Sequence, residues 1–296
     1  MESAVENALR MRIIEWVTAR AESNGGFLHR AELLDFHIDD RRFPIIDYSR
    51  GIRNPVEFSS TLSIVQSAHG PYDDTESDDG LLHYAYQSGD PWGGSNVKLR
   101  SAIESGAPLI LFRKEQANIL TPIAPVYVVD DYEDSRVFLI ALDEAFRFIP
   151  DVRHLSEPQR AYARRLAKVR LHQPAFRTRV LVAYAQRCAI CSLAHGSLLD
   201  AAHIVPDSEP AGAPTVANGL ALCKIHHAAY DQDLIGISAD SRVVVDDDLL
   251  AERDGPMLKH GLQEMHGRTL MVPHGASNRP DRDRLAWRFE RFLARA

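Results

Sequence analysis

Three cysteines and one histidine form the pattern that most restricts how this chain can fold. Cys188 and Cys191 are separated by two residues, and the same spacing recurs between Cys223 and His226. Two such pairs provide the four ligands of a tetrahedral structural zinc site, which must bring two distant segments to one point. Because the chain contains no other cysteine, the pattern predicts a structural Zn²⁺ held by these four side chains.

The histidine next to the last of these ligands must serve a different purpose. Neighbouring residues of an α-helix point about 100° apart, so His226 and His227 cannot face the same site. Asp231 follows His227 by four residues, which places an imidazole nitrogen and a carboxylate on the same helical face. This pair predicts a second site, distinct from the zinc site.

The segment between the two cysteine pairs completes a known order of polar residues. The stretch DAAHIVPDSE carries His203, VANGLALC carries Asn218, and CKIHHAAYD carries His227. This order and spacing resemble the HNH nuclease motif, whose strand–loop–strand–helix unit is the ββα-metal fold, over about residues 170–237. The resemblance extends to restriction-type HNH endonucleases that are built around a CxxC…CxxH zinc.

The resemblance implies a role for each residue of the motif. His203 would be the general base that takes a proton from the attacking water. His227 would hold a divalent ion, Mg²⁺ or Mn²⁺, with Asp231 as a second ligand, and this ion would polarise the scissile phosphate. Asn218 would either brace the loop that holds His203 or bind the ion through its amide oxygen.

One position departs from the family pattern. Many HNH nucleases have Asp or His immediately before the general base, where it binds the metal, and here that position is Ala202. Asp200 is nearby but lies three residues before His203. The complete set of catalytic metal ligands therefore stays open.

Charge is distributed unevenly along a chain whose net charge is −7. The stretch 153–187 contains nine Lys or Arg residues and one acidic residue, whereas PYDDTESDDG (71–80) contains five acidic residues and no basic one. The basic stretch is either a solvated helix face or a surface that binds phosphates with release of counterions. As DNA backbone contacts we expect Arg164, Arg165, Lys168, Arg170, Arg177 and Arg179.

The first half of the chain has a different character from the second. After a predicted N-terminal helix, short strand-like runs such as TLSIVQSA, PLILFR and SRVFLIAL alternate with turn residues, which indicates a curled sheet or barrel. A helical pattern begins after residue 156. We therefore expect an α+β protein with a β-rich domain over 1–150 and a second domain over 151–296.

The acidic segment and the tyrosines around it resemble a module that recognises modified bases. From RGIRNP through GPYDDTESDDG and LLHYAYQSGDPWGG to SRVFLIAL, about residues 43–145, the chain is similar to an SRA domain. Such domains flip 5-methylcytosine out of the duplex and fold as a twisted β-barrel with flanking helices. The resemblance therefore implies an SRA-like barrel in the first half.

The same resemblance implies a pocket for the flipped base. Tyr72 and Tyr86 would sandwich the base, with Tyr84 as an alternative to Tyr86. A carboxylate accepts a hydrogen bond from the exocyclic amine of cytosine, and either Asp74 or Asp73 would provide it.

Together the two halves indicate a modification-dependent, type IV-like restriction endonuclease. It would bind double-stranded DNA that contains 5-methylcytosine or 5-hydroxymethylcytosine and hydrolyse a phosphodiester nearby. One HNH unit cuts one strand, so we expect a homodimer, for which the C-terminal helix with Trp287, Phe289 and Phe292 is a candidate surface. Two alternatives stay open: an HNH endonuclease without modification preference, and a modified-DNA-binding protein whose nuclease half is inactive.

The sequence also indicates where the protein works. No uncharged run approaches the roughly 18 residues of a membrane helix, and acidic residues interrupt the N-terminal segment, which is therefore no signal peptide. Three cysteines are too few, and odd in number, for a disulfide scaffold. We expect a cytoplasmic protein with no membrane partner.

Overall fold

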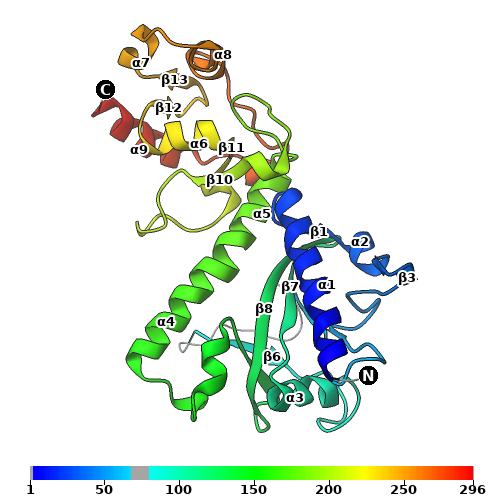
Figure 1. Cartoon of the computed structure of the whole chain (residues 1–296). Helices are drawn as coiled ribbons and strands as arrows, with labels where there is room; N and C mark the ends of the chain where they lie inside the picture. Colours follow the sequence, from blue (N-terminus) through cyan, green and yellow to red (C-terminus); the bar gives the residue numbers. More distant parts are fainter. Residues whose placement is uncertain (1–2, 68–79, 296) are drawn as a thin grey trace. The chain divides into compact units, whose positions relative to one another are not determined.

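The computed structural model describes residues 3–67 and 80–295, and the chain forms two compact units, Met1–Ala175 and Phe176–Ala296. The first unit contains a large sheet with helices, and the second contains two small sheets with helices (Figure 1). The predicted α+β class is confirmed.

A curled seven-stranded sheet forms the centre of the first unit. Its strands are β1 (Leu28–His29), β4 (Ile52–Arg53), β5 (Ser63–Ser67), β6 (Leu82–Ala85), β7 (Leu109–Gln116), β8 (Ile119–Tyr132) and β9 (Val137–Ala141). They lie in the order β4-β5-β7-β8-β9-β6, with β1 paired to β8 beside this path. β5 and β7 run parallel, and the other pairs are antiparallel. Two of the predicted strand-like runs contain β5 and β9, and the run PLILFR covers the first five residues of β7. The sheet curls into a half-barrel.

Helix α1 (Ser3–Ser23) packs against this sheet through its apolar stripe (Figure 1). Ile13 and Val17 are fully buried in a core that they share with Phe112 of β7. The predicted N-terminal helix is therefore confirmed.

Short helices and a small hairpin complete the first unit. They are α2 (Arg30–Leu34), the strands β2 (His37–Ile38) and β3 (Arg41–Arg42) of a small hairpin, α3 (Ser95–Ser105), η1 (Glu144–Phe148), η2 (Val152–His154), α4 (Glu157–Ala167) and η3 (Lys168–His172). The chain then continues directly into α5 (Gln173–Ala183).

The boundary between the two units lies in α5, later in the chain than the predicted division near residue 150. Ala163 of α4 is buried with Leu139 and Phe146, and Leu171 is buried in the core of the sheet. This burial joins the helical segment after residue 156 to the first unit.

The second unit contains a strand–loop–strand–helix arrangement, as the motif predicts. β10 (Leu199–His203) pairs antiparallel with β11 (Gly219–Cys223), a loop over 204–218 connects them, and α6 (Lys224–Asp231) follows directly. The other elements are η4 (Gly196–Leu198), η5 (Val216–Asn218), β12 (Ile235–Ile237), β13 (Val243–Val245), α7 (Asp247–Ala251), α8 (Pro256–Gly261), η6 (Gln263–Met265), η7 (Ala276–Asn278) and α9 (Arg282–Leu293).

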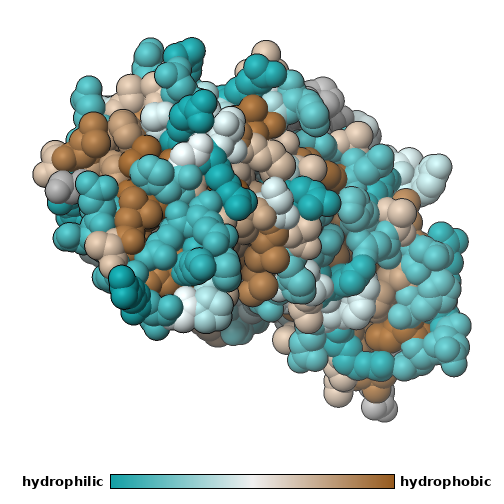
Figure 2. Space-filling view, turned by 90° about the horizontal axis from the view of Figure 1, so that it is seen from above, coloured by the Kyte–Doolittle hydropathy of each residue, from teal (hydrophilic) through white to brown (hydrophobic). Residues whose placement is uncertain are grey.

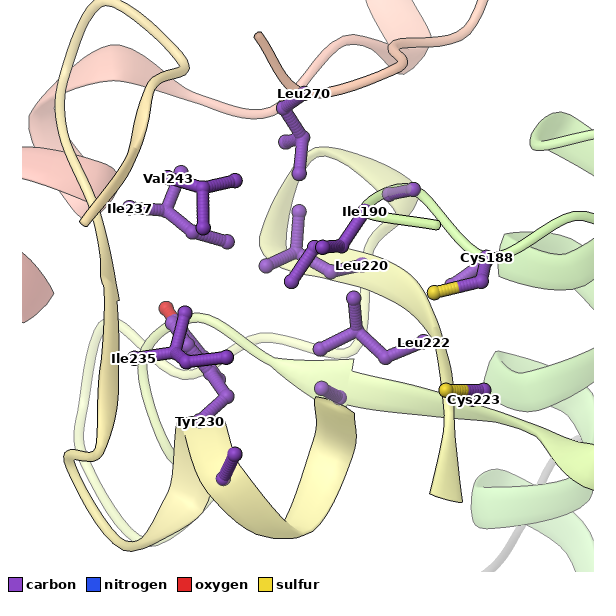
Figure 3. Close-up of a cluster of buried hydrophobic side chains, with 14 of the residues drawn as sticks. Cys188, Ile190, Leu220, Leu222, Cys223, Tyr230, Ile235, Ile237, Val243 and Leu270 are labelled. Atoms are coloured by element: carbon purple, nitrogen blue, oxygen red, sulfur yellow. The ribbon is translucent and has the colours of Figure 1, made fainter. Parts of the chain in front are cut away.

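The core of the second unit extends from these strands to the predicted zinc ligands. Figure 3 shows Leu222 of β11 between Ile235 on one side and Cys188 and Cys223 on the other. All four side chains are buried, and burial of apolar surface stabilises such a core by about 25 cal/mol per Å². The cysteines therefore lie where the chain is well packed.

Hydrophilic side chains cover most of the face seen in Figure 2, and hydrophobic ones appear in smaller groups between them. Within residues 3–67 and 80–295, no helix combines the length and the apolar character needed to cross a membrane.

Candidate functional site

The four predicted zinc ligands, Cys188, Cys191, Cys223 and His226, meet at one point. Their ligand atoms all lie within 4.8 Å of one another, and three of the four residues are buried. Tetrahedral zinc with sulfur at about 2.3 Å holds its ligands roughly 3.8 Å apart. The cluster therefore has the size and the donor atoms to hold a metal ion such as zinc.

The orientation of His226 favours metal binding through its Nδ1 atom. Nδ1 lies 3.1 Å from the sulfur of Cys223 and 3.4 Å from that of Cys188, while Nε2 donates a hydrogen bond of 2.8 Å to the carbonyl oxygen of Gly261. Such a carbonyl acceptor behind the ring orients a metal-binding imidazole. Burial lowers the pKa of His226, but the two sulfurs outweigh burial and raise this pKa to about 10. The sulfurs therefore attract positive charge to this point.

His203 ends strand β10, where it is paired with Gly219 of β11. Its imidazole stacks on the ring of Phe176, with 4.1 Å between the ring centroids and 17° between the ring planes. Because Phe176 is buried, this stack holds the imidazole of His203 in one orientation.

Asn218 holds the loop between β10 and β11 together. It is fully buried, its amide oxygen accepts a hydrogen bond of 2.9 Å from the Val205 N–H, and its amide nitrogen donates to the Val205 carbonyl at 2.9 Å. Gly212 permits the tight loop, since a Cβ there would lie 1.9 Å from the Pro206 carbonyl oxygen. Of the two roles that we expected for Asn218, this geometry favours the bracing role.

His227 lies between two carboxylates. Its Nε2 is 3.3 Å from Oδ2 of Asp231, and its Nδ1 is 3.9 Å from Oδ2 of Asp200. Successive residues of a strand point to opposite sides, so Asp200 lies on the same face of β10 as Ala202. The family pattern has a metal-binding side chain at the position of Ala202. Asp200 places a carboxylate on that same face of β10.

One cavity of about 240 Å³ brings predicted catalytic residues together. The residues that line it are His203, Ile204, Pro206, Asp207, His227, Asp231, Arg288 and Arg291. The predicted general base His203, the predicted metal ligand His227 and its partner carboxylate Asp231 therefore share one space. Asn218 does not line this cavity, in keeping with its place inside the loop.

Three polar residues of the cavity are absent from our sequence predictions. Asp207 lies in the DAAHIVPDSE segment itself, four residues after His203. Arg288 and Arg291 come from α9, near the other end of the second unit's sequence. For Arg288 and Arg291, the sequence signal that could have identified them is the regular spacing of arginines along α9.

The predicted base pocket is described only in part. Tyr72, Asp73 and Asp74 lie outside the residues that the structure describes. Tyr84 belongs to β6 and Tyr86 follows directly after this strand, and both are buried in the hydrophobic core of the first unit.

The contacts of these two tyrosines are those of core residues. The hydroxyl of Tyr84 donates to the carbonyl oxygen of Gly51 at 3.1 Å, and that of Tyr86 donates to Asp131. The Tyr86 ring packs on Phe138 with 4.5 Å between centroids. Burial, followed by the bond to Asp131, raises the pKa of Tyr86 to about 12. This arrangement does not favour either ring as a stacking surface for a base.

The six basic residues expected on the DNA backbone fall into two groups. Exposed on α4 and η3 are Arg164, Arg165 and Lys168. Hydrogen bonds to backbone carbonyl groups are donated by Arg170, Arg177 and Arg179. Arg177 also donates from Nε to the carboxylate of Asp200 at 3.0 Å, and it thereby fixes the carboxylate beside His227.

Comparison with known proteins gives one family match. Residues 188–238 match the family model of the HNH endonuclease. Among solved structures, the chain is similar to the modification-dependent restriction endonuclease TagI, with 15% identity, coverage of 82% of this chain and 85% of that chain, and a TM-score of 0.28. It is also similar to the type IV phosphorothioation-dependent restriction endonuclease ScoMcrA, with 17% identity, coverage of 62% and 48%, and a TM-score of 0.25. No curated protein matches the chain.

Proposed function

We propose that this protein, a DNA endonuclease with an HNH domain over residues 188–238, cleaves DNA in response to cytosine modification. We also propose that His203, His227 and Asp231 form its catalytic site. The observation that carries this site is that the three side chains line one cavity, while the adjacent His226 belongs to the cysteine cluster.

His203 is suited to act as the general base. A neutral imidazole near pH 7 accepts a proton from water within hydrogen-bond reach. The stack on Phe176 holds the ring, and the loop that follows His203 is fixed by the buried Asn218. Both contacts keep the imidazole in place while the proton moves to it.

His227 and Asp231 would hold the divalent ion that HNH nucleases require. When bound, Mg²⁺ or Mn²⁺ polarises the scissile phosphate and stabilises the charge that develops on the leaving oxygen. Carboxylate oxygens suit these ions, and Asp200 brings one more carboxylate to the other nitrogen of His227. Asp200 would serve either as a ligand or as the acceptor that orients the imidazole.

The Cys/His cluster would hold a structural zinc that positions the catalytic helix. Cys223 ends β11 and His226 lies in the first turn of α6. A metal that joins them to Cys188 and Cys191 fixes the start of α6. Because His227 is the next residue, the same metal fixes the direction in which its imidazole points.

The first unit would recognise the modified cytosine. The resemblance to SRA domains and the curled sheet support this proposal. Since Tyr84 and Tyr86 are buried, we assign the base contacts to Tyr72 and to Asp73 or Asp74. Flipping a base costs a few kcal/mol and burial of one methyl group contributes about 0.8 kcal/mol, so we expect finite discrimination against unmodified cytosine.

Cleavage of both strands would require two copies of the nuclease unit, and we propose a homodimer for this reason. Of the aromatic residues of α9 that we considered for the interface, Trp287 is exposed and Phe292 is buried within its own unit. Phe289 is partly buried, so Trp287 is the most exposed of these three aromatic side chains, and we propose that it contacts a second copy.

Digestion of one plasmid, with and without cytosine methylation and with Mg²⁺ or Mn²⁺, tests the proposed function. We expect metal-dependent cutting that is faster on methylated DNA, and Asp74→Ala should reduce this preference while cutting persists. If the preference persists in Asp74→Ala, Asp73→Ala tests the neighbouring carboxylate.

A second candidate function is DNA cleavage without modification preference. The burial of Tyr84 and Tyr86 favours it, because two of the three predicted stacking residues have no open face. Equal digestion of the two plasmids would establish this function and remove the selective one.

A further inference from the structure

Helix α9 and the turn that follows it carry a line of four arginines. Steps of four and three residues separate Arg284, Arg288 and Arg291, which places them above one another on the helix. Arg295 follows four residues later, just after the helix ends at Leu293. Like charges at these spacings destabilise a helix. The one buried carboxylate that pairs with three of them is that of Asp233, so this face keeps a surplus of positive charge.

The first end of α9 is fixed to the loop that follows His203. The backbone N–H of Asp281, the residue before the helix, donates to the carbonyl oxygen of Ala217 at 2.9 Å. Nη1 of Arg284 donates to Oγ1 of Thr215 at 3.3 Å. Both acceptors belong to the part of the loop that leads into Asn218.

The middle of α9 is fixed to the end of the catalytic helix α6. Arg288 donates from Nη2 to the carbonyl oxygen of Tyr230 at 2.6 Å and pairs with the carboxylate of Asp233 at 2.8 Å. Phe292 packs on Gly236, where a Cβ would lie 2.5 Å from the phenyl ring. Anchored to both the loop and α6, α9 holds a fixed position relative to His203 and His227.

Arg291 is the residue of this line that reaches the cavity with an exposed guanidinium. Of the four arginines, Arg288 and Arg291 line the cavity. The side chain of Arg288 is 6% exposed and already bonded, whereas that of Arg291 is 44% exposed. Within the described part of the chain, the partner of Arg291 is Asp233, 3.6 Å from its Nε.

We infer that Arg291 binds a phosphate of the DNA backbone in the cavity that holds His203 and His227. A guanidinium is a planar fork of donors that matches phosphate oxygens. The cavity also contains the carboxylates of Asp207 and Asp231, which repel a phosphate. A fixed positive charge opposite them offsets this repulsion and stabilises negative charge as the phosphodiester is cleaved.

This inference rests on the proposed nuclease function, and one set of variants tests it. Cleavage of the plasmid that the wild-type protein cuts fastest is measured at saturating protein for Arg291→Ala, Arg291→Lys and Arg295→Ala. Arg295 is the matched control, because it follows α9 directly and pairs with the same Asp233 at 2.8 Å but does not line the cavity. DNA affinity and the thermal midpoint are measured for each variant.

We expect Arg291→Ala to reduce the cleavage rate at saturation about 100-fold, the typical effect of removing one donor that stabilises transition-state charge. DNA affinity should fall less than 10-fold, since one contact among many is lost. Arg291→Lys should recover part of the rate, and Arg295→Ala should cut like the wild type.

Two other outcomes would overturn the inference in different ways. If Arg291→Ala and Arg295→Ala cut equally well, or lose rate and thermal midpoint together, Arg291 has no role beyond the contact with Asp233, and the proposed nuclease site stands. If the wild-type protein cuts neither plasmid, the proposed function fails, and the inference fails with it.

Discussion

His226 and His227 are adjacent in the sequence, yet the sites that they form differ in every physical respect. His226 is buried, faces two sulfurs within 3.4 Å and has its second nitrogen bonded to a backbone carbonyl. His227 is 25% exposed and faces the carboxylates of Asp200 and Asp231, which are 40% and 61% exposed. Neighbouring helix residues point about 100° apart, and this rotation separates a closed site from an open one.

This difference decides what each site can do. A structural metal site uses four protein ligands and leaves no position for substrate, whereas a catalytic site keeps positions open for water or substrate. The cysteine cluster provides four protein ligands. The His227 side has few protein ligands and adjoins a cavity of about 240 Å³. Removing a side chain of the cysteine cluster should therefore destabilise the fold. Removing a side chain of the His227 site should instead slow the reaction.

The largest effect should follow from Cys223→Ser. This change removes one proposed zinc ligand from the closed site, and structural zinc contributes roughly 10–16 kcal/mol to folding in small zinc domains. We expect the variant to lose zinc and the second unit to unfold, measured by metal analysis and by circular dichroism during heating. Ser197→Ala, outside the cluster, is the control. Retained zinc with an unchanged melting curve would contradict the closed-site assignment.

The next largest effect should follow from His203→Ala, which removes the proposed base from the open site. A general base contributes about 10²- to 10⁴-fold to rate, so plasmid cutting should fall by about 10³ while DNA binding and the melting temperature change little. His195→Ala removes an exposed histidine outside the cavity and should leave cutting unchanged. Equal activity of the two variants would exclude His203 as the base.

A smaller effect should follow from Asp200→Asn. The change keeps the size of the side chain but removes the charge beside Nδ1 of His227. Loss of a metal-orienting carboxylate typically weakens metal binding 10- to 100-fold, so the Mn²⁺ concentration for half-maximal cutting should rise by that factor. Asp240→Asn is the control, because it removes a carboxylate from an exposed ion pair with Arg282. If the Mn²⁺ concentration for half-maximal cutting does not change, Asp231 and not Asp200 is the carboxylate that supports metal binding.

The contrast between the two sites also explains what could be predicted from the sequence. The spacings within Cys188–Cys191, Cys223–His226 and His227–Asp231 are local, and helix and turn geometry turns such spacings directly into shared faces. The strand-like runs were predictable from their local pattern in the same way, whereas the ββα order was implied by the resemblance to the HNH motif. Arg291 reaches the cavity through the packing of α9 on distant loops, and local spacing carries no information about such packing.

The burial of Tyr86 shows the same limit in the first unit. The sequence places Tyr86 among residues typical of a base pocket, but alternation along β6 does not reveal which face the curled sheet encloses. The structure directs this side chain to Asp131 and Phe138 in the core. A tyrosine therefore has to be tested as a core residue before it is assigned to DNA.

The smallest expected effect is that of Tyr86→Phe, and it distinguishes these two roles. The change removes two hydrogen bonds, the one that the hydroxyl donates to Asp131 and the one that it accepts from Arg100, each worth about 1 kcal/mol. The loss of stability is measured by urea unfolding, and the ratio of cutting between methylated and unmethylated plasmids should not change. The pKa of Tyr86 is raised to about 12 in the folded protein, against about 10 in unfolded chains. Its hydroxyl therefore stabilises the fold fully below pH 10, and this contribution is lost as the pH rises to about 12.

The difference in stability between the wild type and Tyr86→Phe should accordingly narrow across that pH range. Tyr48→Phe is the matched control, because Tyr48 is 82% exposed and should alter neither stability nor selectivity. If Tyr86→Phe instead changes the preference for methylated DNA while stability is unaffected, the hydroxyl acts on the base rather than on Asp131. The first unit would then hold an open site like that of His227, and not a closed core like that of His226.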